Sequence, residues 1–344
     1  MRRALLLIAA GCGSHEPART PPPAPPPAAA GPKTIALPGG SDGLFLDYLA
    51  YDPAHHRVWV PAGGSGRVDV IDARTDQLSS IEGFPVKLVE RRGQKRTVGP
   101  SSATVGDGVV YVGNRGDQTV CAIDATSLVK QGCVALDQSP DGLQYVAATK
   151  EVWVTTPRDK SIRVLDASAP DKPAAKATIQ LDGQPEGFAV DNARGVFFTN
   201  YEDKDQTLVI DLKSHAITKT WQPRCGEDGP KGLALDQPAA HLLVVCPDHV
   251  ETLDAAHDGA VLGTLPVGAG LDAIDLDPAH HLVVAAAGRA GKLAFATLQP
   301  DGTFGQTATV ATADGARNAV ITEDDRAYVA DGKAGAILVI EGRR

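Results

Sequence analysis

Short apolar runs bounded by Gly, Pro or Asp recur along most of the chain. Examples are "VDVID" at 68–72, "VYVGN" at 110–114 and "VWVTT" at 152–156. Runs of this length, rich in β-branched residues and separated by turn residues, are typical of strands. Long apolar patterns with the helical period of about 3.6 residues are absent. The sequence therefore predicts an all-β fold built from many short strands.

One phrase in this pattern occurs twice. "DPAHHRVWVPAG" at 52–63 returns as "DPAHHLVVAAAG" at 277–288, and eight of the twelve positions are identical. A distant second copy is typical of a structural repeat, because each copy builds the same supersecondary unit. Weaker copies share an apolar anchor in their second strand, and successive anchors lie 40 to 52 residues apart. The seven anchors are Trp59, Tyr111, Trp153, Phe197, Val244, Val284 and Tyr328.

The third strand of each repeat has its own marker, an acid at its end in six of the seven copies. The residues at this position are Asp72, Asp124, Asp166, Asp211, Asp254, Thr297 and Glu341. Two markers with one shared spacing predict seven blades of a β-propeller. The seventh repeat stops after its third strand, and the strand-like segment 33–39 precedes the first repeat. We expect this segment to supply the missing strand and close the ring, which removes a free sheet edge.

The phrase that occurs twice is expected to be the turn between the first and second strands of blades one and six. Asp-Pro favours turns, because Pro presets φ and the Asp side chain bonds the nearby backbone. The turn residues would then include His55, His56, His280 and His281. An alternative is a metal site formed by His241 together with His280 and His281. No carboxylate falls at a matching spacing, so no metal site is expected.

The repeats resemble those of the YVTN-type β-propeller proteins of bacteria and archaea. The likeness rests on "VYVGN" (110–114), "VWVTT" (152–156) and "VFFTN" (196–200), each followed by a strand similar to "VxVID". It extends over residues 33–344 and departs from the pattern in blade six, where Thr297 replaces the acid. The resemblance implies the seven-bladed fold. It implies no particular function, because the family includes proteins of unrelated role.

The N-terminal residues are expected to be a targeting segment. Arg2 and Arg3 precede a short apolar stretch, and "AAGC" at 9–12 resembles a bacterial lipobox with Cys12 as the lipidated residue. We therefore expect residues 1–12 to be a lipoprotein-type signal peptide. In the alternative, Cys12 is a thiol beside an ordinary export cleavage site. Both interpretations predict an exported protein.

A tether and a single folded domain are expected to follow. Residues 13–32 are rich in Pro and Ala, a composition that favours an extended polyproline II spacer. Residues 33–344 would form the propeller. Together the segments predict a lipid-anchored protein of the bacterial cell envelope, in the periplasm or at the cell surface.

The remaining cysteines agree with export. Four are left without Cys12, and an even number in an oxidising compartment indicates two disulfides with three possible connectivities. In the propeller, Cys121 and Cys133 lie on the two arms of one hairpin, whereas Cys225 and Cys246 fall on the same face. We predict the pairs Cys121–Cys133 and Cys225–Cys246.

The charged residues point to the mouth of the central channel as the candidate site. The net charge of −9 argues against nucleic acid as a partner. Propellers bind ligands where loops from all blades converge, although the side chains there are also able to pair with each other in water. The first polar residues after the entry turns are Asp47, Ser101, Asp141, Glu186, Lys231, Asp272 and Arg317. Loops after the second strands add Arg115, Arg158, Tyr201 and Arg289 on the same face.

Segment 85–100 makes blade one about eight residues longer than the others. It contains five cations, Lys87, Arg91, Arg92, Lys95 and Arg96. A basic patch on the ligand face would suit a phosphate-bearing ligand, an acidic partner or a nucleic-acid strand, and a solvated loop would have the same composition. The segment has no aromatic residue for stacking on nucleic-acid bases.

No motif for nucleophilic, metal or covalent-haem chemistry occurs in the chain. We therefore expect a monomeric, non-catalytic binding or scaffold module without a cofactor, attached to the membrane only by its lipid. Its partner would be an envelope protein or a small polar or anionic ligand. Two alternatives remain, a lactonase-like hydrolase that uses channel-mouth residues such as Glu186 and Arg317, and a propeller subunit of a periplasmic quinone- or haem-dependent redox system.

Overall fold

The computed structural model describes residues 31–91 and 93–342, and Pro32–Arg344 cluster as one compact unit. The segment expected to be a signal peptide, Cys12, all but the end of the tether and Arg92 lie outside the described residues. No helix within the described part is long and apolar enough to cross a bilayer.

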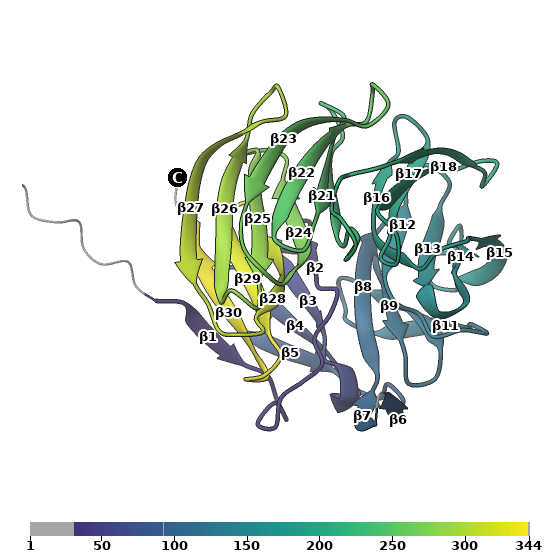
Figure 1. Cartoon of the computed structure of the whole chain (residues 1–344). Coiled ribbons are helices and arrows are strands. Elements are labelled where there is room, and N and C mark those ends of the chain that lie inside the picture. Colours follow the sequence, from purple (N-terminus) through teal and green to yellow (C-terminus); the bar gives the residue numbers. More distant parts are fainter. Residues whose placement is uncertain (1–30, 92, 343–344) are drawn as a thin grey trace, which may run out of the picture. The chain divides into compact units, whose positions relative to one another are not determined.

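Seven four-stranded antiparallel sheets form the blades of the fold (Figure 1), and a separate two-stranded hairpin is the remaining sheet of the described part. Blade one consists of β2 (Ala50–Asp52), β3 (Arg57–Pro61), β4 (Val68–Asp72) and β5 (Leu78–Ile81). Blade two consists of β8 (Pro100–Gly106), β9 (Val109–Asn114), β10 (Thr119–Asp124) and β11 (Lys130–Ala135). Blade three consists of β12 (Leu143–Val146), β13 (Glu151–Thr156), β14 (Ser161–Asp166) and β15 (Ala174–Gln180).

The other four blades repeat this order. Blade four consists of β16 (Pro185–Asp191), β17 (Val196–Tyr201), β18 (Gln206–Asp211) and β19 (Ile217–Trp221). Blade five consists of β20 (Leu233–Asp236), β21 (His241–Val245), β22 (His249–Asp254) and β23 (Ala260–Pro266). Blade six consists of β24 (Leu271–Asp277), β25 (Leu282–Ala287), β26 (Lys292–Leu298) and β27 (Phe304–Ala311). Blade seven consists of β28 (Arg317–Ile321), β29 (Arg326–Asp331), β30 (Ala336–Glu341) and β1 (Lys33–Ala36).

Three short elements lie outside the blades. They are the hairpin of β6 (Lys87–Arg91) and β7 (Gln94–Val98), and the 3₁₀ turns η1 (Gly63–Ser65) and η2 (Pro157–Asp159). The predicted seven-bladed, all-β fold is confirmed.

The second strand of each blade is the most deeply buried, because neighbouring blades cover both of its faces. All seven predicted anchors lie in these strands, and each is 0% exposed. Fourth strands such as β15 and β19 are largely exposed, since they form the outer rim. Apolar clusters fill the interfaces between blades. In the cluster between blades three and four, the ring centroids of Trp153 and Phe197 are 4.6 Å apart.

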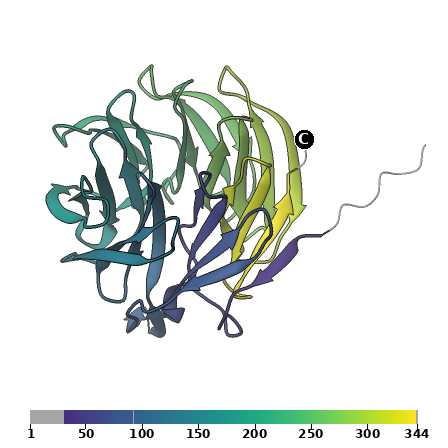
Figure 2. The same ribbon diagram turned by 180° about the vertical axis from the view of Figure 1, so that it is seen from behind.

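The ring closes through the predicted N-terminal strand. β1 pairs antiparallel with β30, with Thr34 opposite Leu338 and Ile35 opposite Ile337. Figure 2 shows this strand (purple) beside the C-terminal strands (yellow). Leu37 then packs in the cluster shared by blades seven and one. The two ends of the folded chain are therefore held in one sheet.

The twice-occurring phrase forms the predicted turn in both blades. Asp52 accepts a hydrogen bond from the Ala54 N–H, and Asp277 accepts one from the Ala279 N–H. The last turn residues, His56 and His281, have φ values of 52° and 51°. The left-handed conformation at this position lets the chain reverse into the second strand. The repeated residues therefore form the same turn geometry in both blades.

Candidate ligand-binding site at the channel mouth

A cavity of about 420 Å³ lies where loops of several blades converge, and we call it the channel-mouth cavity. Its five acidic lining residues are Asp47, Asp141, Glu186, Glu202 and Asp272. Its six basic lining residues are Lys87, Arg96, Arg115, Arg158, Lys231 and Arg317. The uncharged lining residues include Phe45, Pro140 and Gln184. The cavity is therefore dominated by charged side chains of both signs.

The structure brings six of the seven predicted mouth residues together in this cavity. Ser101 is the one that does not line it, and it is only 1% exposed. Its position coincides with a shift in the register of β8 against β9 between Pro100 and Ser102. A bulge of this kind re-aims a side chain, which counting from the entry turn does not anticipate. Ser101 instead contributes its carbonyl oxygen, which accepts a hydrogen bond from the Tyr48 N–H at 3.1 Å.

Arg115 connects three blades at one wall of the cavity. Its Nη2 donates to Asp47 Oδ2 at 2.9 Å and to Asp141, and its Nε donates to the Pro140 carbonyl at 3.2 Å. The guanidinium carbon also lies 5.1 Å from the centre of the Phe45 ring. The side chains of Arg115, Asp47 and Asp141 are 11%, 12% and 20% exposed. This is a nearly buried ion-pair network, in which each charge depends on its partners.

Tyr48 crosses the channel beneath this cavity. It belongs to the chain leading into blade one, and its hydroxyl donates a hydrogen bond to the carboxylate of Glu186 in blade four. Its ring centroid lies 5.4 Å from that of Phe188. Tyr48 and Phe188 both line a second cavity of about 310 Å³ formed by the inner strands. The Tyr48–Glu186 contact therefore lies between an upper and a lower cavity.

Burial raises the pKa values of three acidic residues in the channel-mouth cavity. Burial, reinforced by the charges of Asp141 and Asp272, raises the pKa of Glu186 well above its usual range. Burial also raises the pKa of Asp141 to about 6, although the charge of Arg115 opposes the shift. The pKa of Asp272 is raised for the same reason, against the opposing charge of Arg317. The cavity therefore becomes less negative as the pH falls towards 6.

Two of the basic lining residues lie beside acids, and one has no ion pair in the described part. Arg317 lies 3.2 Å from Asp272, and Lys231 lies 3.9 Å from Glu202. Arg158, an exposed residue of η2, forms no ion pair with any described residue. A charge without an intramolecular partner is available to a ligand.

The predicted basic segment contains the β6–β7 hairpin, which lies beside the cavity. Of its cations, Lys87 and Arg96 line the cavity, and Arg96 lies 4.8 Å from the Phe45 ring centre. Lys95 is exposed and lies outside the lining. The side chains of Arg91 and Arg92 are not among those described. The insertion in blade one thus supplies part of the candidate site.

Only some of the residues predicted on the neighbouring loops line the cavity. Arg115 and Arg158 line the cavity, whereas Arg289 does not and Tyr201 is buried in β17. Phe45, Tyr48 and Glu202 were not predicted. The aromatic pair lies in the irregular segment before β2, where no strand period indicates which way a side chain points.

Several solved structures share this fold. One chain in a crystal structure of a mitotic checkpoint complex superposes with a TM-score of 0.73, at 14% identity over 96% of this chain and 100% of the other. Hydrazine synthase of Kuenenia stuttgartiensis superposes with a TM-score of 0.69, at 14% identity over 89% of this chain and 97% of the other. The β-propeller domain of Cps50 (Swd1) from Myceliophteria thermophila superposes with a TM-score of 0.68, at 10% identity over 90% of this chain and 99% of the other. The chain is a seven-bladed β-propeller.

These identities are low, so the likeness concerns the fold alone. No family model and no curated protein matches the chain. The YVTN-type character of the repeats stays a prediction.

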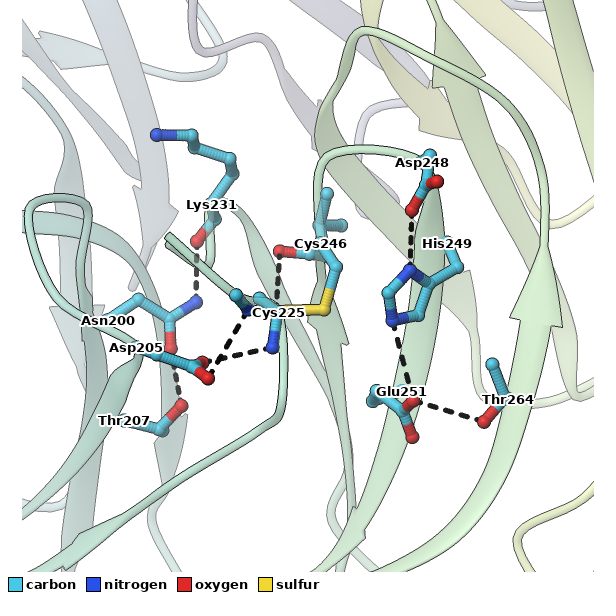
Figure 3. Close-up of a disulfide and its surroundings, with 12 residues drawn as sticks. Asn200, Asp205, Thr207, Cys225, Lys231, Cys246, Asp248, His249, Glu251 and Thr264 are labelled. Atoms are coloured by element: carbon cyan, nitrogen blue, oxygen red, sulfur yellow. Dashed lines mark hydrogen bonds and ion pairs between the residues drawn. A yellow bond between two sulfur atoms is a disulfide. The ribbon is translucent and has the colours of Figure 1, made fainter. Parts of the chain in front are cut away.

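Two disulfides brace the propeller, and both predicted pairs are formed. Cys121–Cys133 joins β10 to β11, where the two residues face each other in the register. Cys225–Cys246 joins the loop before blade five to the end of its second strand (Figure 3). Asp205 accepts hydrogen bonds from the N–H groups of Cys225 and Gly226, at 3.0 and 3.3 Å. The second disulfide therefore anchors the loop that leads to the cavity.

Lys231 follows this anchored loop. Its N–H donates to the Val245 carbonyl at 2.8 Å, next to Cys246. Its carbonyl accepts a hydrogen bond from Asn200 Nδ2 at 2.6 Å, and Asn200 in turn accepts one from the Thr207 hydroxyl (Figure 3). The backbone of this cavity residue is thus held from two blades.

The lower cavity of the propeller contains a partly buried acid, Asp275. Its carboxylate accepts hydrogen bonds from the N–H groups of Ile321 and Leu276, each at 2.9 Å. Burial nevertheless raises the pKa of Asp275 to about 6, and these backbone bonds only partly oppose the shift. Because the folded pKa lies above the unfolded one, the stability that Asp275 contributes at low pH is lost as the pH rises from about 4 through about 6.

Asp275→Asn is therefore expected to raise the free energy of unfolding by about 1 kcal/mol at neutral pH. The amide avoids the cost of a buried charge but keeps only one acceptor oxygen for the two N–H groups. Near pH 4 the same substitution is expected to be destabilising, because the carboxyl is then already neutral. Urea unfolding at both pH values measures the change of sign, with the exposed Asp314→Asn as control. An equal effect at both pH values would assign the change to packing instead of ionisation.

Proposed function

We propose that the protein is an exported, lipid-anchored binding module whose propeller holds a small anionic molecule in the channel-mouth cavity. The lipobox-like "AAGC" at 9–12 and the Pro-rich segment 13–32 support the anchor and the tether. The propeller fold fits a binding or scaffold role. The observation on which the ligand class rests is the charge arrangement of the cavity.

That arrangement favours an anion. Six basic side chains face five acidic ones in the cavity, and burial raises the pKa of Asp141, Glu186 and Asp272. Protonation of these acids removes negative charge from the cavity and leaves its arginines charged. Arg158 is free of intramolecular ion pairs in the described part and presents a planar donor set that suits carboxylate, phosphate or sulfate groups. Protonated Glu186 would offer a hydroxyl donor to the polar body of the ligand.

Calorimetric titration with glucose 6-sulfate and with citrate tests the proposal. Arg158→Ala is expected to weaken binding about tenfold, since a hydrogen bond to a charged group contributes about 1.5–3 kcal/mol. Arg289→Ala is the matched control, because Arg289 occupies the corresponding loop of blade six and does not line the cavity. Binding that Arg158→Ala leaves unchanged would place the anion elsewhere.

The affinity for glucose 6-sulfate is expected to rise as the pH falls from about 8 to about 5. The sulfate stays ionised over this range, whereas Asp141, with a pKa of about 6, takes up a proton. At an effective dielectric constant of about 20, loss of one negative charge about 8 Å from the ligand corresponds to about 2 kcal/mol, or roughly thirtyfold tighter binding. A flat or opposite pH profile would contradict the assigned electrostatics.

A second function is favoured by one observation, the raised pKa of Glu186 in a cavity that is also lined by arginines. A protonated carboxyl in such a site is suited to general acid catalysis, as in hydrolysis of a lactone. Turnover of glucono-δ-lactone that Glu186→Gln abolishes and Arg289→Ala preserves would favour the hydrolase. Anion binding without turnover would favour the binding module over the hydrolase. Failure of all these small molecules to bind would favour an envelope protein as the partner, with the β6–β7 hairpin as its contact.

A further inference from the structure

The lower cavity differs in chemistry from the channel-mouth cavity. Its volume is about 310 Å³, and the first strand of every blade contributes to its lining. Most of the lining residues are apolar, and the aromatic ones are Tyr48, Tyr51 and Phe188. Among the described residues that line it, Asp275 is the one acid, and none is Lys, Arg or His. The lower cavity therefore combines mainly apolar walls with a single carboxylate.

The charge of Asp275 has no cationic partner in the described part of the chain. Its Oδ1 accepts a hydrogen bond from the Leu276 N–H and its Oδ2 accepts one from the Ile321 N–H, each at 2.9 Å. A carboxylate accepts about four hydrogen bonds, so each oxygen keeps a free acceptor position. In the channel-mouth cavity, by contrast, Asp272 lies 3.2 Å from Arg317. Asp275 therefore offers an unbalanced negative charge to a ligand.

This carboxylate is open to a ligand, because Asp275 is only partly buried and lines two adjoining cavities. The second of these has a volume of about 230 Å³ and shares Gln144, Phe188 and Leu233 with the lower cavity. Its remaining lining residues lie further along β16, β20 and β24, towards the ends of these strands that are remote from the channel mouth. A ligand therefore has access to Asp275 from the side away from the mouth.

The aromatic rings favour an organic cation over a metal ion. Tyr48 and Phe188 have ring centroids 5.4 Å apart and planes inclined at 31°, and both side chains are only partly buried. Aromatic faces attract ammonium groups, and they also cover the apolar part of a ligand. A hydrated metal ion gains nothing from apolar walls. A small ammonium ion with an apolar body matches both the carboxylate and the rings.

From this geometry we propose that the lower cavity binds a small organic ammonium ion. Its nitrogen lies at the carboxylate of Asp275, and its apolar part lies against Tyr48 and Phe188. The ammonium N–H groups use the acceptor positions that the two backbone N–H groups leave free. The proposal is independent of the anion proposed above, because the contact between Tyr48 and Glu186 lies between the two cavities.

Calorimetric titration of the whole protein with 2-phenylethylamine tests the site, and 2-phenylethanol is the matched neutral probe. The alcohol keeps the apolar body without the charge, so it is expected to bind at least about tenfold more weakly than the amine. Asp275→Asn is expected to weaken amine binding at least about tenfold, since it removes a hydrogen bond between charged groups. The exposed Asp314→Asn, outside both lower cavities, is the control and is expected to leave the amine affinity unchanged.

Phe188→Leu is a second variant that tests the aromatic wall. Leucine keeps an apolar side chain but removes the ring face, so amine binding is expected to weaken about threefold. Binding of 2-phenylethanol is expected to change less, because the alcohol carries no charge for the ring to attract. Circular dichroism checks that each variant is folded.

The pH dependence of amine binding is a further test. The amine stays charged below about pH 9, whereas Asp275, with a pKa of about 6, takes up a proton as the pH falls. The amine affinity is therefore expected to fall roughly tenfold between about pH 7.5 and about pH 5, opposite in direction to that of glucose 6-sulfate. This dependence is expected to disappear in Asp275→Asn, which separates Asp275 from its charged neighbours. The other titratable side chains of β24 and of the strands packed against it are Asp272, Asp277, Asp236, His241 and Arg317.

Three results would overturn the site. The first is failure of 2-phenylethylamine to bind the folded wild-type protein. The second is an amine affinity that stays the same in both Asp275→Asn and Phe188→Leu. The third is equal affinity for the amine and the alcohol, which would show an apolar pocket in which the carboxylate takes no part. None of these results bears on anion binding in the channel-mouth cavity.

Discussion

Arg115→Ala is expected to lower the free energy of unfolding by about 3–5 kcal/mol at neutral pH. The substitution leaves Asp47 and Asp141 without the cation that both contact, and neither side chain is exposed enough for water to replace it. It also removes the hydrogen bond to the Pro140 carbonyl and the contact with the Phe45 ring. Because Arg115 joins blades one, two and three, the loss affects two blade interfaces at once.

The pH dependence of this loss distinguishes electrostatics from packing. Asp141, with a pKa of about 6 beside Arg115, would titrate at a higher pH without that charge. A protonated Asp141 does not need the cation, so the cost of Arg115→Ala is expected to shrink below about pH 6. Denaturant unfolding at about pH 5 and about pH 7.5 measures the difference. Arg158→Ala, a change at the same cavity without an ion pair, is the control and is expected to have a small effect. A loss that is equal at both pH values would contradict the network.

Removal of the Cys225–Cys246 disulfide, by Cys225→Ser together with Cys246→Ser, is expected to lower the free energy of unfolding by about 3 kcal/mol. The two cysteines are 21 residues apart, so the free chain gains the entropy of an open loop. Lys231 follows the same loop, and its N–H bonds the carbonyl next to Cys246. We therefore expect anion binding in the channel-mouth cavity to weaken about fivefold to tenfold, because the support of a binding residue is loosened.

The other disulfide is the control for this prediction. Cys121 and Cys133 are 12 residues apart on a hairpin, and neither lines the cavity. Their replacement by serine is expected to cost about as much stability, since the entropy of loop closure changes slowly with length. Anion affinity is expected to stay unchanged. If both double variants weaken binding equally, the effect comes from global destabilisation and not from the Lys231 loop.

The fold of this protein was predictable because its determinants are local and repeated. The anchor of each second strand recurs at blade spacing, as does the acid that ends the third strand in six blades, and the "DPAHH" turn occurs in two blades. The acids and the turns act on residues only a few positions away in the chain. Asp124, for example, accepts hydrogen bonds from the N–H groups of Thr126 and Ser127 directly after its strand. The pairing of segment 33–39 with the last repeat followed from a missing strand, and the disulfides followed from the blade frame.

The candidate site was only partly predictable, because its contacts join residues that are remote in the chain. Tyr48 and Glu186 are 138 positions apart, and Arg115 and Asp47 are 68 apart. Repeat spacing predicts that such residues reach one mouth, but not which of them pair. Ser101 illustrates the limit, since a bulge in β8 coincides with its removal from the cavity.

The sequence by itself determined the number of blades and the turns, because their markers act over a short range and recur along the chain. The closing strand and the cysteine pairs then followed from the blade frame. Only the tertiary structure decided the protonation of the cavity acids and the crossing of the channel by Tyr48. These features depend on side chains from different blades and on the burial that the closed ring imposes, and neither is encoded in any single repeat.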